Sequence, residues 1–203
     1  MDLASFIGGV VAALTGVCAT VLVTEKIEEK KHSFESQKAL SRLYIELASL
    51  QEECSSALSM LQDTYYRGWR IEKGIQADSM WDGLSIPKAP STIVLDAHIE
   101  KSLGELTSAQ VQGIKTIRHL CKNIEVCISS LMQQVSEEKI NLQTMKYCIS
   151  VLCALYHLSL NMAEHKSRFI KIDKIPADVQ DSVLSALDID LSFDACAAYQ
   201  PAI

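Results

Sequence analysis

Histidine and cysteine are the side chains of this sequence best suited to acid–base, nucleophilic or metal chemistry. Histidine titrates near neutral pH, and both residue types ligate zinc. Cys153 and His157 lie four residues apart, on one face of a predicted helix, and Cys148 lies near that face. No CxxC or HExxH motif accompanies them. The pattern therefore favours buried cysteines beside a hydrogen-bonded histidine over a metal or thiol site. The histidines are His32, His98, His119, His157 and His165.

Other catalytic motifs are also missing from the sequence. A nucleophilic pair of His119 and Cys121 fails on geometry, because residues two apart on a helix do not face each other. No glycine-rich phosphate loop of the GxxxxGKS/T or GxGxxG type occurs. No arginine is followed by a histidine one to two turns later, the arrangement found in helical ribonucleases of prokaryotic toxin systems. The sequence therefore predicts no catalytic residue, no cofactor and no metal.

The net charge of the chain bears on its binding partners, and its cysteines bear on the cellular compartment. The formal net charge is −6, whereas nucleic-acid binding draws on a basic patch that releases phosphate counterions. We therefore expect no nucleic-acid partner. The seven cysteines are an odd number, and Cys121, Cys127, Cys148 and Cys153 lie inside helical apolar patterns. They predict a reducing compartment, where cysteine acts as a small buried hydrophobe.

The N-terminal segment from Leu3 to Val23 has no charge and no proline. About twenty residues at 1.5 Å each match a hydrocarbon layer of about 30 Å, so the segment predicts a single transmembrane helix. The main alternative is a cleaved signal peptide, which Asp2 and the lack of an early base disfavour. The bases Lys26, Lys30 and Lys31 follow the span, and none precedes it. They predict an N-terminus outside and a cytoplasmic C-terminal domain at the inner or plasma membrane.

Small residues recur along this segment at steps of three and four. Faces of this kind let membrane helices approach closely, so they predict packing between copies of the chain. The alternative is that glycine and alanine are simply common in membrane helices. The residues are Ser5, Gly8, Gly9, Ala12, Gly16, Ala19 and Thr20.

The helix is predicted to continue far beyond the span, because the sequence from 17 to 67 contains neither proline nor glycine. Apolar residues in this part again step by three and four, which is typical of a coiled-coil seam. Ser5, Ala12 and Ala19 lie whole heptads before the first of them, so we expect one continuous face for a parallel oligomer. The seam residues are Leu40, Leu43, Leu47, Leu50, Cys54 and Leu61.

Composition and periodicity together predict an all-α fold. Aromatic residues make up only 6% of the chain, and the apolar stripes after residue 93 repeat at helical spacing. Thr107 with Gln110 has the spacing of a capping box, and Ser136 is the next expected cap. The predicted divisions are a transmembrane anchor at 1–24, a juxtamembrane long helix at 25–74, a loop at 75–92, a helical bundle at 93–187 and an acidic, then apolar tail at 188–203.

Three functions compete on this layout. The leading hypothesis is a non-enzymatic, membrane-anchored protein that self-associates and permeabilises the bilayer as a pore. The alternative is a membrane-tethered scaffold or regulatory subunit that docks a cytoplasmic protein. The third is a helical hydrolase with a non-standard site at His119 or His157. One span, a long helix and a small cytoplasmic bundle are similar in layout to small membrane effectors encoded beside bacterial CRISPR and other anti-phage systems, and this resemblance implies a role in antiviral defence.

Overall fold

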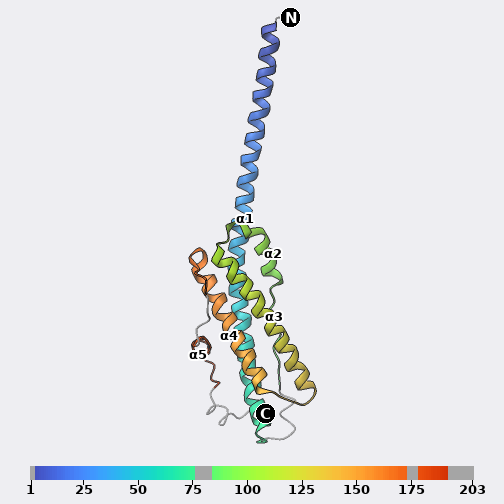
Figure 1. Cartoon of the computed structure of the whole chain (residues 1–203), viewed down its shortest axis with the longest axis vertical. Helices are drawn as coiled ribbons and strands as arrows, with labels where there is room; N and C mark the ends of the chain where they lie inside the picture. Colours follow the sequence, from blue (N-terminus) through green and yellow to red (C-terminus); the bar gives the residue numbers. More distant parts are fainter. Residues whose placement is uncertain (1–2, 76–83, 173–177, 192–203) are drawn as a thin grey trace.

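The computed structural model describes residues 3–75, 84–172 and 178–191, with side chains from residue 23 onward except that of Ile93. Every regular element in these ranges is helical, as predicted. The long helix α1 is followed by a short α2, by α3 and α4 in a hairpin, and by a short α5 (Figure 1). The bounds are α1 Leu3–Glu72, α2 Ile93–Ser102, η2 Leu103–Glu105, α3 Ser108–Ser136, α4 Leu142–His165, η3 Lys166–Arg168 and α5 Val179–Ala186.

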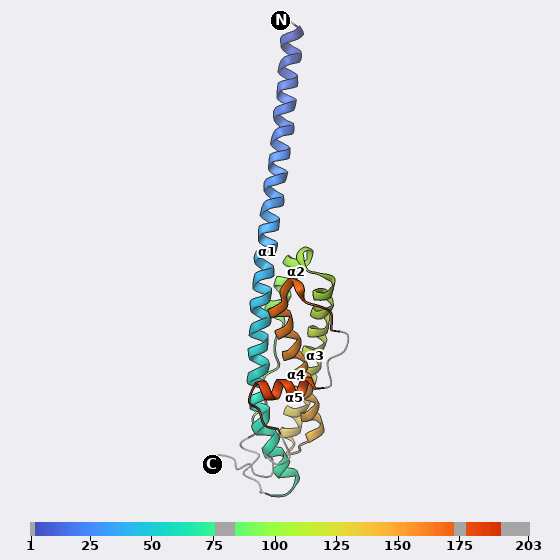
Figure 2. The same ribbon diagram turned by 90° about the vertical axis from the view of Figure 1, so that its left-hand side faces the viewer.

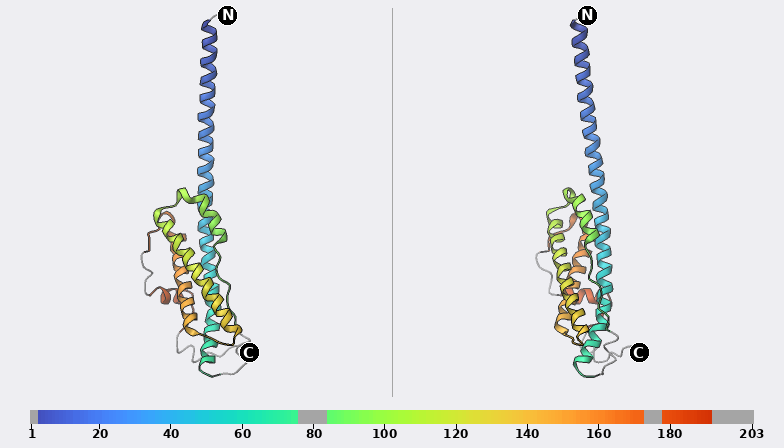
Figure 3. Two further views of the ribbon diagram at one scale, coloured as in Figure 1. Left: turned by 45° about the vertical axis from the view of Figure 1, so that its right-hand side comes forward. Right: turned by 90° about the vertical axis from the view of Figure 1, so that its right-hand side faces the viewer.

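The first half of α1 extends beyond the bundle as a single helix, and the second half lies inside the bundle (Figures 1 and 3). Its 70 residues form one unbroken element, as predicted. The helix ends where Gly74 takes a φ of 64°, which lets the amides of Gly74 and Ile75 bond the carbonyls of Ile71 and Arg70. This is the Schellman geometry that favours glycine just past a helix end.

The predicted membrane span lies within α1, and the structure gives it a helical backbone. Among the residues searched, which are those that the structure describes, no helix has the length and apolar character to cross a membrane. The predicted packing residues lie where no side chain is described, so their contacts are outside the described part of the chain. They are Ser5, Gly8, Gly9, Ala12, Gly16, Ala19 and Thr20.

The second half of α1 packs against α4 and α2, and α3 packs against α4. The predicted seam supplies the α1 side of this core: Leu43, Leu47, Cys54 and Leu61 are 0% exposed. Leu50 is also buried, and Leu40 is partly buried against the same cluster. The assignment of this stripe to contacts between copies is therefore wrong in this fold. Another copy cannot reach side chains that the chain's own helices already cover.

The prediction of one continuous face depends on how far the helix is supercoiled. A heptad repeat matches 3.5 residues per turn, whereas a helix without supercoiling has 3.6 and drifts by about 20° per heptad. Ser5 and Leu40 are five heptads apart in the sequence. Their directions then differ by about 100° on α1. A shared heptad phase in the sequence is therefore not enough to place the two sets of residues on one face of a straight helix.

Capping explains where the next two helices begin. Thr107 and Gln110 form the predicted capping box of α3. Ser136 is not the cap of α4, because α3 itself runs on to Ser136. Asn141 takes that role, and its side-chain oxygen accepts the amides of Gln143 and Thr144 at 2.9 and 3.3 Å. The turn between the helices includes Glu138 with a φ of 53°.

Polar contacts tie the other elements to α1. The buried Gln110 side chain donates to the Tyr44 hydroxyl at 2.6 Å and to the Lys166 carbonyl at 3.0 Å. The loop before α2 runs back along α1, since the Thr64 hydroxyl donates to the Ser85 carbonyl at 2.7 Å. The bundle thus includes α1, whereas the sequence placed the bundle at 93–187 alone.

The start of the predicted tail is packed rather than loose. Helix α5 lies against α4 (Figure 2). After it, Ile189 is 8% exposed, and the Asp190 carbonyl accepts a hydrogen bond from Gln62 of α1 at 3.1 Å. The tail from residue 192 onward lies outside the described residues.

Candidate functional site

The histidines are dispersed rather than gathered into a site. His119 is exposed on α3, with its Nε2 3.2 Å from the Asn123 amide nitrogen. His157 is partly buried on α4 and has the same relation to Asn161, at 3.3 Å. Each is thus placed beside an asparagine of its own helix. Within the searched, described part of the chain, no three His, Cys, Asp or Glu side chains are grouped to hold a metal ion.

The buried cysteines are poor nucleophiles. Cys148 and Cys153 are 0% exposed, and burial raises the pKa of each thiol to about 12. Burial likewise raises the pKa of Cys121 to about 12 and that of Cys54 well above its usual value. Because the thiolate is the reactive form, these residues remain inert thiols at neutral pH. Their position fits the predicted role as small core hydrophobes.

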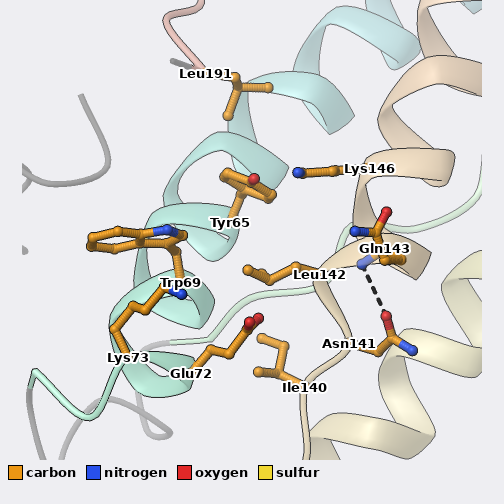
Figure 4. Close-up of a pocket in the computed structure, with 10 residues that line it drawn as sticks. All are labelled: Tyr65, Trp69, Glu72, Lys73, Ile140, Asn141, Leu142, Gln143, Lys146 and Leu191. Atoms are coloured by element: carbon orange, nitrogen blue, oxygen red, sulfur yellow. Dashed lines mark hydrogen bonds between the residues drawn. The ribbon is translucent and has the colours of Figure 1, made fainter. Parts of the chain in front are cut away.

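A pocket of about 540 Å³ opens at the end of the bundle farthest from the N-terminus. Tyr65 and Trp69 reach it from the last turns of α1, and Leu142 reaches it from the start of α4 (Figure 4). Both aromatic side chains are 8% exposed. The remaining lining residues are Glu72, Lys73, Ile140, Asn141, Gln143, Lys146 and Leu191.

The pocket joins an apolar floor to a polar rim. Lys146 and Gln143 are exposed at the rim on α4, and Glu72 at the end of α1 and Lys73 just after it are also exposed. Close packing of α1 against the connection between α3 and α4 supports this wall, because the Ile140 side chain occupies the place where a Cβ on Gly68 would stand. Such a hollow suits an apolar side chain with a nearby polar group. This is the usual composition of a recognition pocket.

The predicted basic residues lie on the part of α1 that extends from the bundle. Lys26, Lys30 and Lys31 are all exposed there. The bundle begins with Ser36, which is 4% exposed and whose hydroxyl donates to the Lys101 carbonyl at 3.0 Å. Residues 23–35 are therefore a solvent-exposed helix, which we call the stalk.

Sequence reasoning missed the pocket and found the stalk. The pocket joins residues from the end of α1 and the start of α4, about seventy positions apart, and only their aromatic character was noticeable in the sequence. No protein-family model, curated protein or solved structure matches the chain.

Proposed function

We propose that this chain is a membrane-tethered scaffold whose bundle docks a cytoplasmic protein. The observation that carries the proposal is the single unbroken helix α1, which joins the apolar segment 3–23 to the bundle through an exposed stalk. The basic residues of the stalk support a cytoplasmic bundle. Membrane insertion is inferred from the sequence alone, because segment 3–23 has no charged residue and its length matches a hydrocarbon layer of about 30 Å.

The length of α1 defines what such a tether does. From Val23 to Ser36, at 1.5 Å per residue, the stalk spans about 20 Å. From Val23 to Tyr65 the distance along the helix is about 60 Å. The pocket of Tyr65 and Trp69 would thus face the cytoplasm, away from the bilayer. A partner that inserts an apolar side chain there would be held at a fixed height above the membrane.

Membrane flotation tests the tether. The full chain should float with vesicles and resist alkaline carbonate extraction. The variant Val11→Lys, Leu14→Lys should fail to insert, because each lysine at the centre of a span costs about 2.5 to 3.5 kcal/mol on insertion scales. Met132→Lys is the matched control, since Met132 is 48% exposed on α3. If alkaline carbonate removes the unaltered chain from the vesicles, the proposal is refuted.

A second candidate function is self-association into a membrane pore. The seven packing residues predicted in segment 3–23 favour it, because close backbone approach drives packing between helices in lipid. The leucines of the predicted seam do not support self-association, since they form the core of a single chain. The span segment alone would then hold the copies together.

A further inference from the structure

The side of α1 that faces away from the bundle carries large apolar side chains that are exposed to solvent. Val23 is 56% exposed, Ile27 61%, Phe34 68% and Ile45 66%. At about 100° per residue, the last three point within about 40° of Val23, whereas the core residue Leu43 points about 160° away from it. We call this exposed side the outer face of α1. Single exposed apolar residues are ordinary, but a row of them along one side of a helix is the pattern of a helix that packs against another.

The charged residues on this part of α1 are sorted by side. Measured from the middle of the apolar row, every lysine and arginine between residues 23 and 45 lies within about 85°, and every carboxylate lies more than about 90° away. The outer face is therefore flanked by positive charge, and the negative charge lies on the other side. The bases are Lys26, Lys30, Lys31, Lys38 and Arg42, and the acids are Glu25, Glu28, Glu29 and Glu35, all of them exposed.

The upright position of α1 in the proposed tether keeps most of the outer face away from lipid. The helix has no break between segment 3–23 and the bundle, so it leaves the bilayer near Val23 and continues outward (Figure 2). Phe34 then lies about 16 Å and Ile45 about 33 Å farther along the axis. The headgroup layer of one leaflet adds only about 5 to 8 Å. Lys38, at about 22 Å, lies more than two Debye lengths from Val23 at physiological salt.

A second copy of the chain also fits the outer face poorly. Copies anchored in one membrane are parallel, and a seam with Ile27 and Phe34 at its core positions would set Lys30 of one copy against Lys30 of the other. Lys26 of each copy would lie next to Lys31 of the other, at the flanking positions that set partner choice in a coiled coil. Like charges at these positions oppose pairing.

We propose that the outer face of α1 binds an acidic amphipathic helix of the cytoplasmic partner, packed alongside α1. Apolar side chains of that helix pack on Ile27, Phe34 and Ile45, and its carboxylates lie beside the lysines that flank them. The same flanking charges that repel a second copy thus attract this partner. The face is about 33 Å long, which matches a helix of about six turns. The inference deepens the docking role and rests on the proposed tether; it gives the partner a second surface besides the pocket.

Binding of designed peptide helices to the full-length protein in phosphatidylcholine nanodiscs tests the proposal. The acidic probe has about four heptads, with leucine at positions a and d and glutamate at e and g; the basic probe has lysine in place of glutamate. Like charges at e and g keep each probe from pairing with itself. Fluorescence anisotropy of the labelled probe gives its Kd. Co-elution of the protein with the discs tests the tether separately.

We expect the acidic probe to bind and the basic probe not to bind. The double variant Ile27→Gln, Phe34→Gln should weaken binding at least about tenfold, because it removes the apolar contact. The triple variant Lys30→Gln, Lys31→Gln, Lys38→Gln should weaken it at least about fivefold, as several flanking ion pairs are lost together. Added salt should act in the same direction.

Two control variants separate the outer face from other sites. The variant Glu25→Gln, Glu28→Gln, Glu29→Gln removes as many charges from the opposite side of α1 and should not weaken binding. Lys146→Gln removes a charge at the rim of the pocket and should change the Kd less than about twofold. If Lys146→Gln weakens binding and the outer-face variants do not, the helix docks at the pocket, which overturns the inference and keeps the docking role.

The remaining outcomes also decide the inference. Equal binding of the two probes overturns the role of the lysines. Failure of the acidic probe to bind protein that co-elutes with the discs overturns this inference alone. Protein that stays out of the discs refutes the tether and, with it, the upright α1 on which the inference rests. If Ile27→Gln, Phe34→Gln lowers the mass of the protein in mild detergent, a second copy covers the outer face and the inference is wrong.

Discussion

Replacing Leu47 by alanine distinguishes a core helix from an oligomer seam. Leu47 is 0% exposed within one chain. A Leu→Ala change at such a site removes the transfer free energy of the side chain and leaves a cavity, which costs about 2 to 5 kcal/mol. Ile45, two residues away, is 66% exposed. Ile45→Ala should change stability by less than about 0.5 kcal/mol.

The assay is urea unfolding of the full chain in mild detergent, followed by circular dichroism at two protein concentrations tenfold apart. A core position predicts a lower midpoint for Leu47→Ala that is the same at both concentrations. A seam between copies predicts a midpoint that rises with concentration, because association stabilises only the folded form. A concentration-dependent midpoint, or a loss below about 1 kcal/mol for Leu47→Ala, would refute the assignment of Leu47 to the core.

Three further predictions concern the polar core, the thiols and the N-terminal helix. Gln110→Leu leaves the groups that hydrogen-bond to the Gln110 side chain without their partner, so the free energy of unfolding in urea should fall by about 2 to 4 kcal/mol. Gln112 is exposed, so the control Gln112→Leu should change it little. Equal losses for the two variants would contradict the assigned hydrogen-bond network. The folded-state pKa of Cys148 is raised to about 12, so its contribution to stability should be intact below pH 9 and lost as pH rises toward 12. Alkylation of Cys148 itself in the folded protein at pH 8, located by peptide mass spectrometry, would contradict this. The double variant Gly9→Leu, Gly16→Leu should convert any discrete oligomer in detergent to monomer. If the mass of the protein in detergent is the same with and without these substitutions, the copies do not pack through these glycines.

Periodicity in the sequence was enough to predict the helices and most of their buried faces. The α3 stripe is an example, since Ile117, Ile124 and Leu131 are almost fully buried. The capping box of Thr107 also takes its predicted role. These features are local, so residue type and spacing determine them.

The sequence could not determine which segment packs against each apolar helix face. An apolar stripe with steps of three and four is the same for a helix inside a bundle and for a coiled coil. Only the packing of α4 and α2 against α1 assigns Leu43 and Leu47 to the chain's own core. The cap of α4 was missed for a similar reason. Both Ser136 and Asn141 suit a cap, and the extra turn of α3 decides between them.

The pocket was beyond sequence reasoning because it is a tertiary feature. Tyr65 and Trp69 were noticeable only as aromatic residues near a helix end. The hollow arises where the end of α1 meets the start of α4. The exposed apolar residues Val23, Ile27 and Phe34 of α1 could be told from its core residues only when the buried side of the helix was known.

Amide hydrogen exchange along α1 in zwitterionic nanodiscs tests the central proposal most directly. The tether predicts that amides of 3–22 exchange far more slowly than those of 25–34, because the hydrocarbon layer excludes water from one part of the same helix. The stalk then serves as an internal reference in every sample. Equal exchange in the two segments would contradict a membrane-spanning anchor and leave the bundle without its proposed tether.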